Sequence, residues 1–143
     1  TKMLKNPNNC HYKSSLDVAA TNQAILADGL INFDIINTNT GVSIDYSTGK
    51  VVTLKQPGLY HVDLQATVEP TAAGLVTMNL LKGGVVIPGK NPAAAAAAAG
   101  SAVSLTTAAD IYIPCCGVPA TISAQIDVAG TVVSATMVVT KMA

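Results

Sequence analysis

The chain has 143 residues, with eight acidic residues balanced by eight lysines and no arginine. Half of its residues are hydrophobic, but only 11% are charged, compared with about a quarter in a typical soluble domain. The length predicts one domain, and a neutral chain without arginine is poorly suited to binding nucleic acid. So little surface charge favours self-assembly over a monomer that precipitates easily.

No apolar run reaches the roughly 18 residues that a membrane-spanning helix needs, and no secretory signal pattern is present. We therefore predict no membrane partner. Thr1 is the residue that remains when an initiator methionine is removed. This favours an unprocessed product made in the cytoplasm, with a removed leader as the alternative.

Residues 1–24 differ from the remainder because they show neither helical nor strand periodicity and are rich in lysine and asparagine. We predict that they form an arm or anchor ahead of a domain at residues 25–143. Its candidate anchoring residues are Lys2, Lys5, Cys10 and Lys13. A disordered N-terminus is the alternative interpretation.

Beyond residue 25, apolar residues alternate with polar ones in short runs separated by glycine and proline, a pattern typical of half-buried strands. In the clearest run, Tyr60, Val62 and Leu64 are predicted to face the core. Eight or so short strands with turn signals between them predict an all-β sandwich or jelly roll. The runs identified cover residues 41–46, 51–54, 60–68, 76–80, 85–87, 122–128 and 133–140.

Residues 93–99 are seven consecutive alanines between Pro92 and Gly100. Alanine is the strongest helix former, but this run is too short to hold a helix in water by propensity alone. In an all-β context we predict an extended or loop segment, packed near a crowded interface, rather than a short helix.

The three cysteines, Cys10, Cys115 and Cys116, do not have the number or spacing of a disulfide framework. For the adjacent pair we favour half-buried free thiols, with a vicinal disulfide or half of a metal site as alternatives. The acidic residues are scattered singly, so no calcium site is predicted.

No catalytic motif is present, and we predict neither an enzyme nor a cofactor. His61 and Asp63 lie two residues apart on one strand face, where they can interact. Polar interface residues explain such a pair better than catalysis does. A ring of His61 side chains around an axis, binding a metal or responding to pH, is an alternative.

Three segments resemble the tumour-necrosis-factor-like superfamily, whose members include complement globular heads. They are Ser47-Thr48-Gly49-Lys50 with Gln56-Pro57-Gly58-Leu59-Tyr60, the hairpin Leu80-Leu81-Lys82-Gly83-Gly84-Val85-Val86-Ile87-Pro88-Gly89, and the closing strand at residues 134–141. The hairpin is similar to the bacterial and phage branch, which includes prophage structural proteins and the C-terminal domains of collagen-like spore-surface glycoproteins. No collagen-like Gly-X-Y tail precedes the domain here.

The resemblance implies a ten-strand jelly roll that trimerises about a three-fold axis. The side chains that it implies at that axis are His61, Gln65, Thr136 and Val138. These assignments depend on strand register, since a slip of one residue would exchange the two faces.

Two functions are consistent with these features. The first is a phage virion structural protein, a trimeric capsid decoration or head fibre, made in the bacterial cytoplasm and attached to its particle through residues 1–24. The second is a recognition trimer on a spore or cell surface, or at a phage receptor-binding tip, that binds a glycan or a protein. The low aromatic content, 3%, is poorly suited to stacking on sugars and favours the first.

Overall fold

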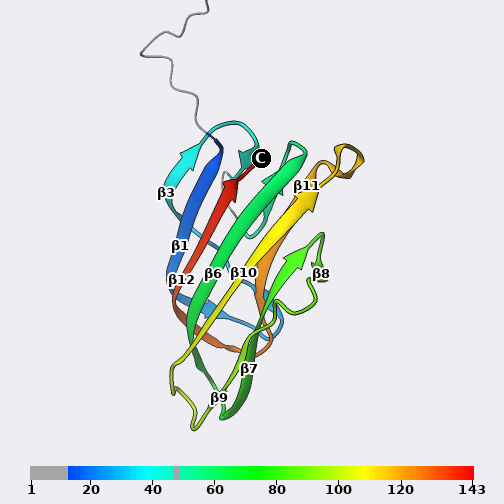
Figure 1. The fold of residues 1–143 in the computed structure, drawn as a ribbon. Helices are drawn as coiled ribbons and strands as arrows, with labels where there is room; N and C mark the ends of the chain where they lie inside the picture. The colour runs from blue at the N-terminus through cyan, green and yellow to red at the C-terminus, as the bar shows by residue number, and fades with distance from the viewer. Residues whose placement is uncertain (1–12, 47–48) are drawn as a thin grey trace, which may run out of the picture.

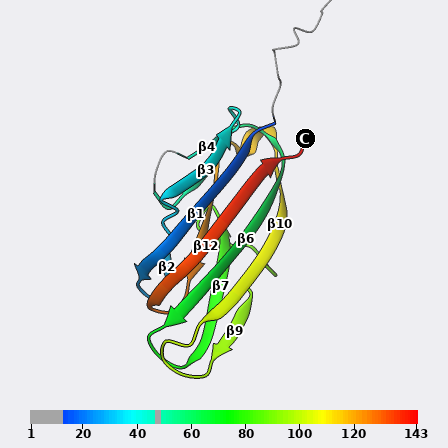
Figure 2. The same ribbon diagram turned by 90° about the vertical axis from the view of Figure 1, so that its left-hand side faces the viewer.

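The computed structural model describes residues 13–46 and 49–143, which form two antiparallel sheets packed face to face (Figures 1 and 2). One sheet has five strands, and Figure 2 shows them side by side. Their order across the sheet is β10 (Val103–Ile113), β6 (Gly58–Pro70), β12 (Gly130–Lys141), β1 (Ser15–Ile25) and β3 (Ile35–Thr40).

The second sheet has seven strands, most of them short. Its main path is β4 (Ile44–Asp45), β5 (Val52–Leu54), β11 (Ala120–Ile126), β7 (Gly74–Lys82) and β8 (Val85–Val86), while β2 (Gly29–Leu30) pairs with β11 and β9 (Ala93–Ala96) pairs with β7. A 3₁₀ turn, Cys115–Gly117, joins β10 to β11. The prediction of an all-β jelly roll is therefore confirmed.

The core lies between the two sheets and is formed by every second residue of the strands. Tyr60, Val62 and Leu64 are at most 2% exposed, as the alternation predicted. Met78 and Ile122 meet them from the opposite sheet and are fully buried. Burying each of these large side chains stabilises the fold by about 1.5–3 kcal/mol. The apolar side chains at every second position therefore hold the two sheets together.

The predicted boundary between an arm at residues 1–24 and a domain at residues 25–143 is wrong for residues 15–24. These residues belong to β1, which lies between β12 and β3 in the five-stranded sheet. Leu16, Val18 and Ala20 are fully buried. The domain therefore includes β1, and residues 1–12 lie outside the described residues.

The predicted strand at residues 41–46 is also largely wrong, because only Ile44–Asp45 is a strand there. Val42 is 69% exposed, while Ser43 is buried. The Ser43 backbone N–H donates to Ser14 Oγ at 2.8 Å, and its hydroxyl donates to Gln56 Oε1 at 2.6 Å. These hydrogen bonds satisfy the buried serine and turn Val42 outward.

The alanine run is extended, as predicted, at least over its first half. Residues 93–96 form β9, and their pairing with β7 gives the backbone groups the partners that a short helix would have had to provide alone. Ala96 is buried, and the alanines after it are exposed.

We expect Gly41→Ala to destabilise the fold more than Gly89→Ala does. The two glycines have nearly equal left-handed φ values, +79° and +78°, so both substitutions cost about 1–2 kcal/mol of backbone strain. A Cβ at Gly41 would also lie 2.7 Å from Ser14 Cα, whereas nothing lies within 4 Å at Gly89. Urea denaturation of the two variants tests this, and equal destabilisation would contradict it.

Candidate interaction face of the five-stranded sheet

The five-stranded sheet turns one surface toward the core and leaves the other open. The outward side chains on its four longest strands are mostly short and polar, and we call this surface the open face. Its residues are Ser104, Thr106, Ala108, Asp110 and Tyr112 of β10, His61, Asp63, Gln65, Thr67 and Glu69 of β6, Ser134, Thr136, Val138 and Thr140 of β12, and Ser15, Asp17, Ala19 and Thr21 of β1.

The strand register brings the four residues implied at the trimer axis onto this one surface. Thr136 pairs with Gln65, and Thr140 pairs with His61. Val138 lies between those two rows and pairs with Asp63. The structure thus places His61, Gln65, Thr136 and Val138 on the outward side of two neighbouring strands.

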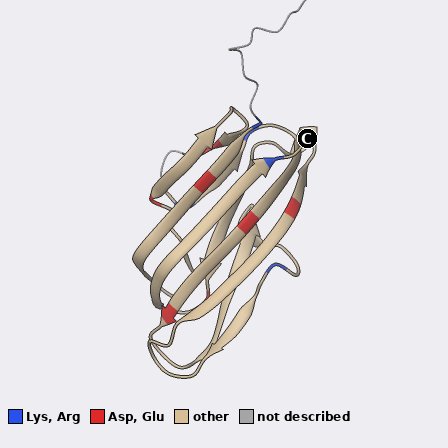
Figure 3. Ribbon diagram, turned by 60° about the vertical axis from the view of Figure 1, so that its left-hand side comes forward, with Lys and Arg blue, Asp and Glu red and all other residues tan. Residues whose placement is uncertain are grey.

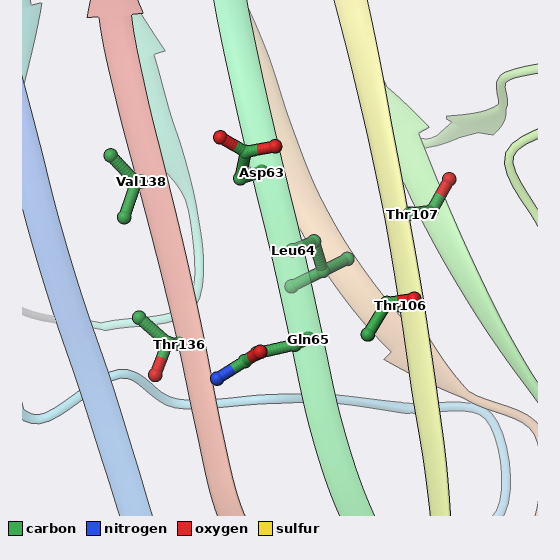
Figure 4. A pocket seen from close by; sticks show the side chains of 7 residues that line it. All are labelled: Asp63, Leu64, Gln65, Thr106, Thr107, Thr136 and Val138. Atoms are coloured by element: carbon green, nitrogen blue, oxygen red, sulfur yellow. The ribbon is translucent and has the colours of Figure 1, made fainter.

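A shallow hollow of about 330 Å³ lies in the middle of the open face, over β6. Figure 4 shows Gln65 extending from β6 toward Thr136 on β12, with Thr106 on the other side. Asp63, Leu64, Thr107 and Val138 also line it. The hollow exists because short threonine and valine side chains flank β6, so a side chain from outside can enter it.

The open face carries acidic residues and no lysine. Figure 3, which looks onto the five-stranded sheet, shows acidic positions along its strands. Asp17, Asp63, Glu69 and Asp110 are the acidic residues, and no lysine lies among the outward residues defined above. Lys13 and Lys141 are near its end, where their Nζ atoms donate to the backbone oxygens of Met142 and Ala143.

His61 lies between two of these carboxylates. Its Nδ1 is 2.6 Å from Asp110 Oδ1 on β10, which is directly opposite in the register. Its Nε2 is 3.3 Å from Asp63 Oδ1, two residues further along β6. The hydrogen bond to Asp110, followed by the attraction of Asp63, raises the pKa of His61 although partial burial opposes them.

The same geometry makes His61 a poor general base. A base must present an unshared ring nitrogen to the group that it deprotonates. Both ring nitrogens of His61 face carboxylates instead. The pair predicted from sequence, His61 with Asp63, is therefore a charge cluster with three members rather than half of a catalytic set.

Asp110, the member with the shorter contact, was missed because β10 was not among the predicted strands. Its signal was present in the sequence: Val103, Leu105, Ala109, Ile111 and Ile113 are all buried and occur at alternate positions. Thr107 interrupts that series with a polar residue on the core side, which weakens the alternation.

In the part of the chain that the structure describes, no group of three or more histidine, cysteine or acidic side chains could hold a metal ion. No helix among those residues is long and apolar enough to cross a membrane.

Cys115 and Cys116 are free and exposed, so the predicted half-burial of the pair is wrong. Of the predicted anchoring residues, Lys13 is described and exposed, while Lys2, Lys5 and Cys10 lie outside the described residues.

No protein-family model matches the chain, and no curated protein is similar to it in sequence. Solved structures are similar in fold. The globular domain of the zebrafish complement 1qA protein matches with a TM-score of 0.69 at 10% identity, covering 92% of this chain and 98% of that one. Murine APRIL at pH 8.5 matches at 0.64 and 11% identity, covering 92% and 100%.

The vertex protein P5 of the phage PRD1 also matches, with a TM-score of 0.56 at 12% identity, covering 94% of this chain and all of the other. Identities this low establish the fold alone. The chain therefore has the jelly-roll fold of tumour-necrosis-factor-like and complement globular-head domains, which confirms that part of the resemblance.

We expect Asp110→Asn to lower the pKa of His61 more than Asp63→Asn does, because the contact with Asp110 is shorter and is the main cause of the raised value. An NMR titration of the His61 ring protons in each variant measures this. Both variants remove one negative charge from the same surface, so each is the control for the other. A larger decrease in Asp63→Asn would contradict the expected order.

Proposed function

We propose that this chain is a non-enzymatic structural protein of a phage virion, a homotrimeric capsid decoration or head fibre attached to its particle through the residues ahead of β1. The observation that carries the proposal is the open face. It is a sheet surface whose centre is a hollow flanked by threonine and valine side chains, and such a surface suits close approach by another copy.

The size of the open face suits a subunit interface. Four strands about 4.8 Å apart, each crossing this face for about nine residues at about 3.3 Å per residue, give a surface of about 600 Å². Stable interfaces bury about 800 Å² on each partner, so side chains at the strand edges would need to contribute as well. In a three-fold assembly His61, Gln65, Thr136 and Val138 are then the residues nearest the axis.

The position of β1 and β12 in the fold supports attachment to a particle at one end of the molecule. The start of β1 and the end of β12 lie at the same end of the molecule (Figures 1 and 2), since Ser15 pairs with Thr140. Residues 1–12, with Lys2, Lys5 and Cys10, precede that end. The similarity in fold to the PRD1 vertex protein P5 supports a place on a large particle.

A second candidate is a recognition trimer on a spore, cell or phage-tip surface, binding a glycan or a protein. Tyr112 favours it, because this aromatic side chain is 67% exposed at the end of β10 and an exposed aromatic ring can stack on a sugar. The fold is shared with a complement globular domain and with the Eiger TNF of S. frugiperda. A glycan array on the purified protein distinguishes this function from decoration.

We expect the whole chain to have three times its monomer mass in solution, and Thr136→Glu to reduce it to the monomer. The added carboxylate fills the hollow and increases repulsion on a face that already carries four acidic residues. Thr53→Glu is the matched control, because Thr53 is half-buried in β5 of the opposite sheet. Light scattering at micromolar concentration measures all three proteins.

A wild-type chain that stays monomeric would contradict the proposed trimer. A trimer that Thr136→Glu leaves intact while Thr53→Glu disrupts it would place the interface on the other sheet. Binding of the protein to particles, with and without residues 1–12, then tests the proposed attachment.

A further inference from the structure

We propose that His61 makes assembly through the open face dependent on pH, with the trimer favoured when the imidazole is protonated and weakened when it is neutral. This inference rests on the proposed trimer. It is carried by the arrangement of charges on the open face and by the contacts that each ring nitrogen makes.

The register places three of the four acidic residues of the open face in two neighbouring rows, while Glu69 lies further along β6. One row contains Asp63, Val138 and Asp17 on adjacent strands, so the two carboxylates are about 10 Å apart at the strand spacing. The next row contains Asp110 opposite His61. With His61 protonated these four groups carry a net charge of about −2, and with His61 neutral about −3. Bringing three such faces together is therefore less costly at lower pH.

The atomic contacts sharpen this difference. A protonated imidazole has an N–H on each ring nitrogen and can donate to Asp110 and Asp63 together. A neutral imidazole has one N–H, which the shorter contact assigns to Asp110. The other nitrogen then presents its lone pair to Asp63 at 3.3 Å, and attraction becomes repulsion.

That repulsion acts where another copy would pack. Asp63 belongs to the charge cluster and also lines the central hollow, together with Thr136 and Val138. When His61 loses its proton, the carboxylate of Asp63 loses its hydrogen-bond donor and must be solvated by water. A neighbour that covers the hollow excludes this water, so covering it costs more when His61 is neutral.

The ionisable groups around His61 are carboxylates and one tyrosine. Asp110 lies opposite it on β10, Asp63 follows it on β6, and Asp17 lies beyond β12 on β1. Tyr112 is two residues beyond Asp110 on β10, and the partner of His61 on β12 is the uncharged Thr140. His61 is the one histidine in the described part of the chain, and imidazole is the side chain that ordinarily changes charge between about pH 5 and 8.

The sign follows from the charges on the open face. Because three faces repel one another less when His61 is protonated, association favours the protonated imidazole and is lost as pH rises through the pKa of His61, which the contacts with Asp110 and Asp63 raise above its ordinary value. Association should therefore weaken with increasing pH.

The test is sedimentation or light scattering of the whole chain over a range of concentrations, from about pH 6 to about pH 8.5. We expect an apparent dissociation constant about tenfold larger at the upper end, equivalent to about 1.4 kcal/mol. His61→Gln should remove most of this dependence. The chain has two histidines, so His11→Gln is the matched control and should keep the dependence.

A trimer whose dissociation constant does not change with pH would overturn the inference and leave the proposed trimer intact. The same holds for a pH dependence that persists in His61→Gln or disappears in His11→Gln. A chain that is monomeric at every pH would instead contradict the proposed function itself.

Discussion

The division of β6 into two faces is the constraint on which the rest of the structure depends. This strand pairs along its length with β10 on one side and β12 on the other, so its register fixes both neighbours. Tyr60, Val62 and Leu64 are buried in the core, and the side chains of the residues between them lie on the open face. Because side chains alternate strictly, the same residues that define the hydrophobic core also determine which polar groups meet on the outside.

Much of the fold could be predicted from sequence because alternation survives wherever a strand has one buried face. The central strand β6 and the C-terminal strand β12 were predicted on this basis. The prediction failed where tertiary hydrogen bonds decide the outcome. Ser43 is buried because Ser14 and Gln56, from distant segments, supply its partners. β1 was missed because its polar residues and the lysines before it obscured the buried Leu16, Val18 and Ala20.

Only those residues of the candidate site that lie on the same strand could be predicted from the sequence to share one face. His61, Asp63 and Gln65 share a face by spacing alone, and the structure agrees. Their relation to Thr136 and Val138 depends on the pairing of β6 with β12, across some 70 residues of chain. The role of Asp110 requires the pairing of β6 with β10. Strand pairing is set by the whole core, so no local pattern could have revealed that His61 has a carboxylate at each nitrogen.

The start of β1 and the end of β12 lie at the same end of the sandwich, which has a practical consequence for displaying peptides on this fold. A peptide fused after Ala143 would emerge beside the residues that precede β1, and would compete for space with anything bound there. The opposite end of the sandwich carries the exposed alanines that follow β9 and the turn between β6 and β7 (Figure 1). Ala97, Ala98 and Gly100 are exposed and lie outside any strand. A foreign epitope inserted among them would point away from the start of β1 and the end of β12, so it would leave residues attached at that end unobstructed.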